Sequence, residues 1–248
     1  MNEEDKEISE EILEKIVEKI VEEIHQKTQI PCINLKLIPD SSKPLSVYHI
    51  KIGGVPYMPK DYPYPTNCDG KPLVLLAQLN FSTLPKLENY PQDGILQFYI
   101  FNNDSYGLDW DAYDNQDNFR VVYHKEILPE AELKTDIPAI EHNEYSYLEE
   151  YSLPFEYDQE FELVGELAID VINTHSEYYY NYEKFESLVK QISEKYIGKK
   201  VLFNDIHDKI FDKFGAKYDF QIGGYPDYTQ GEPRDGQNGK YDRYIHYF

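Results

Sequence analysis

Cysteine and long apolar runs are scarce in this chain. Its two cysteines, Cys32 and Cys68, stand 36 positions apart (68 − 32) and form no CxxC pair, which excludes a disulfide scaffold and a four-cysteine zinc site. The longest apolar run, Leu73 to Leu79, has the length of a strand and falls far short of the roughly 18 residues of a membrane span. Residues 1–5 are acidic, whereas a secretory signal begins with basic residues. We therefore expect a soluble cytoplasmic protein with reduced thiols.

Positive charge is also scarce. The 248 residues include 46 Asp plus Glu but 24 Lys plus Arg, and the formal net charge is −22 at pH 7. Such a field repels phosphate backbones and anionic lipids, so we expect neither nucleic acid nor a membrane as a partner. It attracts a basic protein, a polyamine or metal cations, but the same charge also serves solubility alone. Both interpretations stay open.

Residues 3–27 form the clearest local pattern, with apolar residues at helical spacing between Glu and Lys. These apolar positions are Ile8, Ile12, Leu13, Ile16, Val17, Ile20, Val21 and Ile24. They predict an amphipathic helix, with Asn2 as its N-terminal cap and Pro31 just beyond its end. The apolar seam covers about two heptads, whereas a coiled coil needs three or four. We therefore expect the helix to pack on the protein's own sheet rather than on a partner.

Short apolar segments follow this helix and are separated by Pro, Gly, Asn and Asp, which predicts a mainly β region. The expected strands span residues 33–37, 47–52, 73–79, 95–101 and 119–123. Asp93-Gly94 directly precedes the fourth of these strands, and such a pair favours the positive φ of a hairpin turn. The strands over 73–79 and 95–101 are therefore expected to be neighbours.

The second half of the chain predicts one strand and two helices. Residues 125–157 are acidic and Tyr-rich without clear periodicity, so we expect loops there, with one short helix near 145–151. A strand is expected over 161–171, a helix from Phe185 to Tyr196 that ends at Gly198, and a short helix around 206–214 that ends at Gly215. The predicted fold class is therefore α+β, with an N-terminal amphipathic helix and two further helices.

Two stretches of the sequence repeat each other. Lys51 to Tyr57 and Gln221 to Asp227 both contain Ile-Gly-Gly-x-Pro, and the two copies are offset by 170 residues (222 − 52). In each copy a strand enters a corner where glycines allow a sharp turn or a close backbone approach. The corner residues are Gly53, Gly54 and Pro56 in the first copy, and Gly223, Gly224 and Pro226 in the second. The repeat suggests an internal duplication.

Several short motifs extend this observation along the chain. They are Ile52-Gly53-Gly54-Val55-Pro56, Leu76-Ala77-Gln78-Leu79, Gly94-Ile95-Leu96-Gln97-Phe98, Tyr106-Gly107-Leu108-Asp109, Phe119-Arg120-Val121, Gly223-Gly224-Tyr225-Pro226, Thr229-Gln230 and Pro233-Arg234. From about residue 30 to 235 the sequence thereby resembles the YwqG-like family of uncharacterised proteins. The resemblance implies an α+β fold with a pseudo-duplicated antiparallel β core. It implies no established activity and therefore no catalytic residues.

This resemblance also implies a domain organisation. The N-terminal helix, residues 1–30, would pack on a single domain over 31–248 with two related halves, about 46–123 and 160–248. From Ile222 the chain has 27 residues left (248 − 222 + 1), against 50 in the first unit from Ile52 to Phe101. The second half is therefore expected to be shortened, either by natural truncation or with a C-terminal sheet edge covered by a second copy, because exposed strand edges tend to pair.

Five polar residues are candidates for ligand contacts. Gln78 and Gln97 lie within apolar strands, where an unpaired amide costs roughly 1–3 kcal/mol, so each must have a partner, either structural or a ligand. Arginine is scarce, and Arg120 and Arg234 fall within the motifs given above, as does Gln230. An arginine can bind a carboxylate or phosphate with two parallel hydrogen bonds. An internal Asp or Glu and an anionic ligand are both possible partners.

Familiar catalytic and metal-binding patterns do not fit. The Asp-rich loop 102–118 departs from an EF-hand, because Asp114 stands where the loop needs glycine. His142-x-Glu144 and His175-x-Glu177 have no Pro-Cys-x-x-Cys to complete a deaminase zinc site. HExxH and GxSxG are both absent. We therefore expect no catalytic residues, metal or cofactor, although an enzyme is not excluded.

Two functional hypotheses remain. The first is a non-catalytic binding protein for a basic protein partner, because acidity and 24 tyrosines provide a surface suited to protein contacts. Tyr57, Tyr62 and Tyr64, in a Pro-rich loop, are the expected exposed part of it. The alternative is a small-molecule-binding protein or enzyme with a polar pocket between the two halves, lined by Gln78, Gln97, Arg120 and Arg234.

Overall fold

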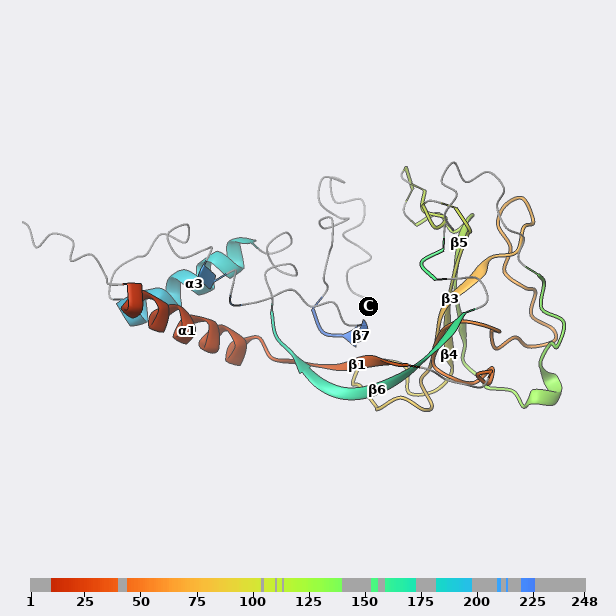
Figure 1. The fold of residues 1–248 in the computed structure, drawn as a ribbon, viewed down its shortest axis with the longest axis horizontal. Coiled ribbons are helices and arrows are strands. Elements are labelled where there is room, and N and C mark those ends of the chain that lie inside the picture. The colour runs from red at the N-terminus through yellow and green to blue at the C-terminus, as the bar shows by residue number, and fades with distance from the viewer. Residues whose placement is uncertain are drawn as a thin grey trace, which may run out of the picture. The chain divides into compact units, whose positions relative to one another are not determined.

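The protein is described from a computed structural model. The structure describes residues 10–39, 44–103, 105–109, 111–112, 114–139, 153–155, 159–172, 182–197, 209–210, 213 and 220–225. Its helices are α1 (Glu10–Lys27), the 3-10 turn η1 (Glu130–Glu132) and α3 (Tyr182–Ile197). Its strands are β1 (Ile30–Ile38), β2 (Lys51–Gly53), β3 (Val74–Asn80), β4 (Ile95–Ile100), β5 (Phe119–His124), β6 (Glu160–Asp170) and β7 (Phe220–Gly223). The predicted α+β fold class is thus confirmed (Figure 1).

The strands form one seven-stranded sheet in the order β5-β4-β3-β2-β6-β1-β7. By contacts between residues the chain divides into two compact units, residues 1–34 with 167–248, and residues 35–166. The division falls inside β1 and inside β6, so both strands have residues in each unit. The expected split into a helix over 1–30 and one domain with two related halves stays a prediction.

The expected pairing of β3 with β4 is confirmed. The two strands are antiparallel, with Gln78 opposite Gln97 and Asn80 opposite Ile95. The connection between them is longer than a tight hairpin, because β3 ends at Asn80 and β4 begins at Ile95. Gly94 has a φ of +93°, and a Cβ there would lie 2.6 Å from the carbonyl oxygen of His124. Glycine is therefore needed at this point for a close backbone approach rather than for a two-residue turn.

The expected strand over 47–52 is wrong in its first half. Residues 47–49 lie in a turn, and the strand begins at Lys51. The carbonyl oxygens of Val47 and His49 accept hydrogen bonds from the Gln78 side chain, and that of Tyr48 accepts one from Asn80. Because side chains of β3 satisfy these backbone groups, the segment needs no neighbouring strand.

The other predicted strands are confirmed with small shifts at their ends. β3 begins one residue later than expected, β4 ends one residue earlier, and β5 continues to His124. The predicted strands over 33–37 and 161–171 correspond to β1 and β6. The short helix expected near 145–151 lies outside the described residues, as do Gly198 and Gly215, which were predicted to end two other helices.

In the unit of residues 35–166, a buried apolar cluster lies on each face of the sheet. On one face Tyr99, Val122 and Leu75 pack with Met58 and Leu73. On the other, Val74 and Ile100 pack with Leu153. Directly opposed residues of antiparallel strands share a face, so Gln97 and Tyr99 lie on the same face as Val122 and Arg120. This is the face that carries the buried polar residues.

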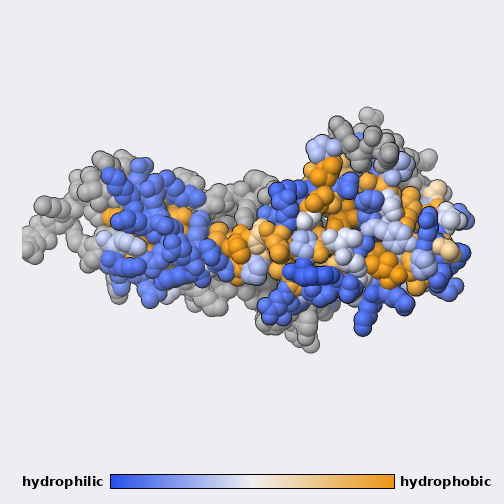
Figure 2. Space-filling view, turned by 90° about the horizontal axis from the view of Figure 1, so that it is seen from below, coloured by the Kyte–Doolittle hydropathy of each residue, from blue (hydrophilic) through white to orange (hydrophobic). Residues whose placement is uncertain are grey.

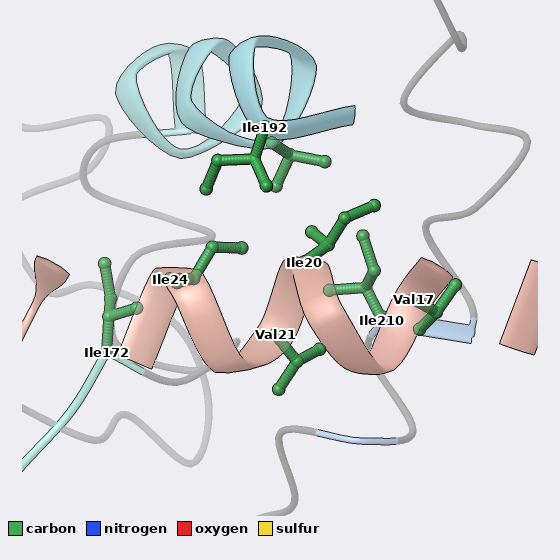
Figure 3. Close-up of a cluster of buried hydrophobic side chains, with 8 residues drawn as sticks. Val17, Ile20, Val21, Ile24, Ile172, Ile192 and Ile210 are labelled. Atoms are coloured by element: carbon green, nitrogen blue, oxygen red, sulfur yellow. The ribbon is translucent and has the colours of Figure 1, made fainter. Parts of the chain in front are cut away.

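In the other unit, α1 packs against α3. The buried cluster contains Val17, Ile20, Val21, Ile24, Ile172, Val189, Ile192 and Ile210 (Figure 3). The predicted helix is thus confirmed from Glu10 onward, and residues 3–9 lie outside the described part of the chain. The expectation that this helix packs on the sheet is wrong. Its apolar stripe packs against the complementary apolar stripe of α3 (Tyr182–Ile197). The side of α1 seen in Figure 2 is almost entirely hydrophilic.

Polar contacts fix the same pair of helices. The Glu23 carboxylate accepts a hydrogen bond from Lys195 Nζ at 2.7 Å and one from the Tyr196 hydroxyl at 3.1 Å. Lys195 and then Lys27 hold the pKa of Glu23 at about 2. Of the second predicted helix, Lys209, Ile210 and Lys213 are helical, and the remainder lies outside the described residues. No described helix combines the length and apolar character needed to cross a membrane.

Candidate functional site

Gln78 and Gln97, two of the predicted ligand contacts, lie side by side in the buried face of the sheet. They are opposite one another on β3 and β4, and both side chains are fully buried. Gln97 Nε2 donates a hydrogen bond to Gln78 Oε1 at 2.8 Å. The sequence therefore identified two residues that do form one cluster.

The Gln78 amide both donates and accepts hydrogen bonds. Its Nε2 donates to the carbonyl oxygens of Val47 at 2.8 Å and His49 at 2.9 Å, and its Oε1 accepts from the backbone N–H of Tyr57 at 2.8 Å. Gln97 Nε2 also donates to the carbonyl oxygen of Tyr57 at 2.7 Å. The two side chains thus fasten the segments at 47–49 and 57 to the sheet. These contacts favour a structural role, and ligand binding by either residue stays a hypothesis.

His124 completes this cluster at the end of β5. Its Nε2 lies 3.1 Å from Gln97 Oε1, which also accepts a hydrogen bond from the Tyr99 hydroxyl at 3.2 Å. Because Gln97 Oε1 is an acceptor, Nε2 of His124 carries the proton in the neutral ring. The Tyr57 and Tyr62 rings pack edge-to-face against the imidazole, with their ring centroids 5.2 and 4.9 Å from its centroid. Burial lowers the pKa of His124 below its usual value and thereby favours the neutral ring in the folded protein.

This lowered pKa predicts a loss of stability in acid. Between the folded pKa and the unfolded value of about 6.5, the unfolded chain binds more protons, so the free energy of unfolding falls as pH falls. Urea unfolding of the wild type and of His124→Gln from about pH 8 to about pH 5 measures this effect. The wild type is expected to lose more free energy of unfolding than the variant, because carboxylate titration is common to both. Parallel curves for the two proteins would contradict the prediction.

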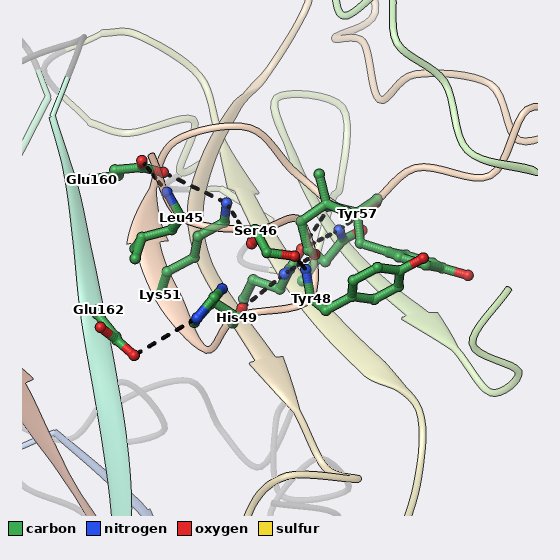
Figure 4. Close-up of polar contacts among 11 residues, drawn as sticks. Leu45, Ser46, Tyr48, His49, Lys51, Tyr57, Glu160 and Glu162 are labelled. Carbon is green, nitrogen blue, oxygen red and sulfur yellow. Dashed lines mark hydrogen bonds and ion pairs between the residues drawn. The ribbon is translucent and has the colours of Figure 1, made fainter. Parts of the chain in front are cut away.

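Lys51 lies at the entrance to the first glycine corner and is fully buried. Its Nζ is 3.6 Å from Glu160 Oε2 and 3.4 Å from the carbonyl oxygen of Ser46, as Figure 4 shows. Burial lowers the pKa of Lys51, and the Glu160 carboxylate opposes that shift. Glu160 Oε1 also accepts a hydrogen bond from the backbone N–H of Leu45 at 2.7 Å. An amine of lowered pKa is a chemically useful base, but full burial keeps this one from a dissolved substrate.

The first corner is shaped by close contacts with the start of β6. Gly53 and Gly54 have φ values of +67° and +71°, in the left-handed region that glycine favours. A Cβ on Gly53 would lie 2.5 Å from the Gln159 carbonyl oxygen, and one on Gly54 would lie 2.2 Å from Glu160 Oε2. Pro56, which follows them, is buried. The glycines are therefore required both by conformation and by space.

The second corner has a comparable local arrangement. Gly223 and Gly224 have φ values of +73° and +78°, and a Cβ on Gly224 would lie 2.5 Å from Asp170 Oδ2, at the other end of β6. The same oxygen accepts hydrogen bonds from Gln221 Nε2 at 3.1 Å and from the Tyr225 N–H at 2.8 Å. In both corners, then, a carboxylate of β6 contacts the second glycine. Pro226 lies outside the described residues.

Of the two arginines predicted to contact a ligand, the structure describes Arg120. Arg120 lies opposite Tyr99 on β5, and its Nη2 donates to the carbonyl oxygen of Thr66 at 3.4 Å, so it does not join the Gln78–Gln97 pair. Arg234 and Gln230 lie outside the part of the chain that the structure describes. The role of all three in ligand binding stays a prediction.

The Asp-rich loop is held by its own hydrogen bonds. Asp109 Oδ1 accepts from the N–H of Asp111 at 2.9 Å, and Asn115 Nδ2 donates to Asp109 at 3.1 Å and Asp117 at 3.0 Å. Within the described ranges, no group of three or more His, Cys, Asp or Glu side chains could hold a metal ion. Asp104 is not among the described residues.

Four residues of these clusters were not singled out from the sequence. They are Lys51, His124, Glu160 and Asp170. The repeat did contain Lys51 and Gln221 at matching positions, but nothing local indicated that these side chains meet carboxylates from β6. His124 directly follows a predicted strand, a position that alone does not indicate burial.

Comparison with family models supports the resemblance at a coarser level. A model described as a domain of unknown function, DUF1963, matches residues 50–247. A search of curated proteins found no match. Because the family model covers most of the sequence, including both glycine corners, the chain belongs to the DUF1963 family, a domain of unknown function.

Proposed function

We propose that this protein is a cytoplasmic, non-catalytic binding protein for a basic protein partner. The observation that carries the proposal is the net charge of −22, together with the exposure of the acidic side chains that surround the sheet end at β5. These exposed residues are Asp93, Asp111, Asp114, Asp117 and Glu126. A surface of one sign attracts and orients a partner of the opposite sign.

The aromatic content supports the same proposal. Tyr62, Tyr106 and Tyr123 are exposed, and tyrosine is enriched in protein interfaces because it combines apolar area with a polar hydroxyl. The expectation of an exposed loop around Tyr57, Tyr62 and Tyr64 is right for Tyr62 alone. Tyr64 is half-buried and packs against the cluster that contains Tyr99. Tyr57 is completely buried, because its backbone is bonded to Gln78 and Gln97.

The small-molecule alternative has less support. The Gln78 and Gln97 amides direct their hydrogen bonds to each other and to nearby backbone, and Lys51 is buried. The described polar contacts of Gln78, Gln97 and Lys51 all lead to other atoms of this chain. A polar pocket between the predicted halves therefore remains the second hypothesis.

We propose three further properties of this protein. The first is membership of the YwqG-like group, on the motifs given above. The second is an internal duplication, supported by the paired positive φ values and the β6 carboxylate at each corner. The third is a homodimer through an incomplete C-terminal sheet edge, supported by the terminal position of β7 in the sheet.

Affinity capture at two salt concentrations tests the binding function. The full chain is immobilised beside a carrier of polyglutamate at equal charge density, and lysate is applied at about 50 mM and about 300 mM NaCl. We expect a defined basic protein to be retained by the chain at low salt, released at high salt and absent from the polyglutamate carrier. The purified partner should then bind the purified chain. Equal capture by both carriers, or no basic partner at low salt, would contradict the proposal.

A further inference from the structure

β5 is the terminal strand of the sheet and pairs only with β4 among the described strands. The backbone N–H of Val121 donates to the Gln116 side chain at 3.1 Å, so it points away from β4. In an antiparallel strand the N–H and C=O of one residue point to the same side, and residues two apart share that side. The N–H of Tyr123 and the carbonyl oxygens of Val121 and Tyr123 therefore also point outward from the sheet.

These outward groups have no hydrogen-bond partner among the described residues. The Tyr123 hydroxyl donates to the carbonyl oxygen of Asp93 at 2.7 Å, but its backbone makes no such contact. The side chains beside this edge are apolar and accessible, with Val121 38% and Tyr123 45% exposed. An edge of this kind is a ready template for another strand.

Acidic side chains lie at both ends of this edge. Asp114 and Asp117 precede β5 and are exposed. At the other end Asp93 and Glu126 are exposed, but Lys86 Nζ lies 4.0 Å from Asp93 Oδ1 and Lys125 precedes Glu126. The edge thus offers unused backbone groups and an apolar centre, with the excess of negative charge at the end that carries Asp114 and Asp117.

We propose that the outer edge of β5 binds a basic segment of a partner protein in extended conformation, which adds to the sheet as a further strand. This inference rests on the proposed function and names its binding site. The backbone of the added strand bonds the N–H of Tyr123 and the carbonyl oxygens of Val121 and Tyr123, while the N–H of Val121 stays bonded to the Gln116 side chain. The apolar side chains of the added strand pair across the strands with Val121 and Tyr123. Lysines or arginines at its ends lie near Asp117 and Glu126, and one of them can stack on the Tyr123 ring.

The charge of the protein favours this occupant over a second copy of the chain. At this edge a second copy would bring the same acidic residues, among them Asp114, Asp117 and Glu126, close to those of the first. Like charges opposed across an interface reduce affinity, whereas a basic segment removes the repulsion.

A short peptide with two lysines at each end and alternating valine and threonine between them tests the site. Its binding to the full chain is measured by fluorescence anisotropy and by amide chemical shifts. A control peptide of equal charge carries two adjacent prolines at its centre, which remove one N–H donor from each of its edges. We expect the control to bind about tenfold more weakly, and the shifts of the first peptide to centre on residues 119–124.

Variants of the edge give the matched comparison. Tyr123→Pro removes the outward N–H donor but none of the hydrogen bonds to β4, and is expected to weaken peptide binding about tenfold. Tyr123→Phe keeps the donor and the ring, and should bind within about twofold of the wild type. If Tyr123→Pro does not fold, Val121→Lys replaces it, with Val164→Lys as the control, because Val164 is a valine of similar exposure (41%) on β6.

The outcomes separate this inference from the binding function itself. If both peptides bind equally and release with salt, or if Tyr123→Pro and Val121→Lys bind as the wild type does, the β5 site is wrong while charge-driven binding stands. A dimer in sedimentation that Val121→Lys dissociates would assign the edge to a second copy and overturn the proposal. If no basic peptide or protein binds at low salt, the proposed function fails as well.

Discussion

The variant Gln78→Leu is expected to lose about 3–5 kcal/mol of unfolding free energy, because one buried and two partly buried backbone groups would each lose a partner, at roughly 1–3 kcal/mol for a buried one. Those groups are the Tyr57 N–H and the carbonyl oxygens of Val47 and His49. Leucine has a similar volume to glutamine, so the loss comes from unpaired polar groups rather than from a cavity. Partial access of water to the turn at 47–49 keeps the total below the sum of the separate costs.

Urea unfolding measures this loss, and Gln26→Leu provides the control. Gln26 is exposed on α1, and among the described residues its side chain hydrogen-bonds Glu22 alone, at 3.4 Å. Surface changes of this kind usually stay within about 0.5 kcal/mol. The same variants separate structure from ligand binding. If Gln78→Leu proved as stable as the wild type but no longer bound the basic partner, the structural role argued for Gln78 would be wrong and a binding role would replace it.

Gly53→Ala is expected to cost about 3 kcal/mol or more of unfolding free energy. A left-handed backbone costs a non-glycine residue roughly 1–2 kcal/mol, and overpacking adds roughly 1–3 kcal/mol. The φ of Gly53 is +67°, and the added Cβ would lie 2.5 Å from the backbone oxygen of Gln159. A backbone atom directly before β6 cannot move aside as the end of a flexible side chain can.

Gly70→Ala isolates the conformational part of this cost. Gly70 has a φ of +79°, and a Cβ there would meet nothing within 4 Å. We therefore expect Gly70→Ala to lose only about 1–2 kcal/mol, clearly less than Gly53→Ala in the same thermal or urea experiment. Equal losses for the two variants would show that the close approach of β6 to the first corner contributes nothing.

Much of the fold and part of the site could be predicted from the sequence. Apolar spacing identified α1 and α3, and short apolar runs identified β3, β4 and β5, because these periodicities follow directly from helix and strand geometry. Two buried amides, Gln78 and Gln97, were recognisable because a polar residue in an apolar strand must have a partner. The glycine doublets were recognisable because positive φ is costly for other residues.

Tertiary structure alone decided which groups those residues meet. The sequence does not tell that Val47 to His49 form a turn bonded to β3 side chains, nor that Lys51 and Gln221 meet carboxylates at opposite ends of β6. The predicted packing partner of α1 was the sheet, whereas α1 packs on α3. The physical reason is that periodicity reports which face of an element is apolar, while its partner and the exposed edge at β5 depend on how distant segments pair.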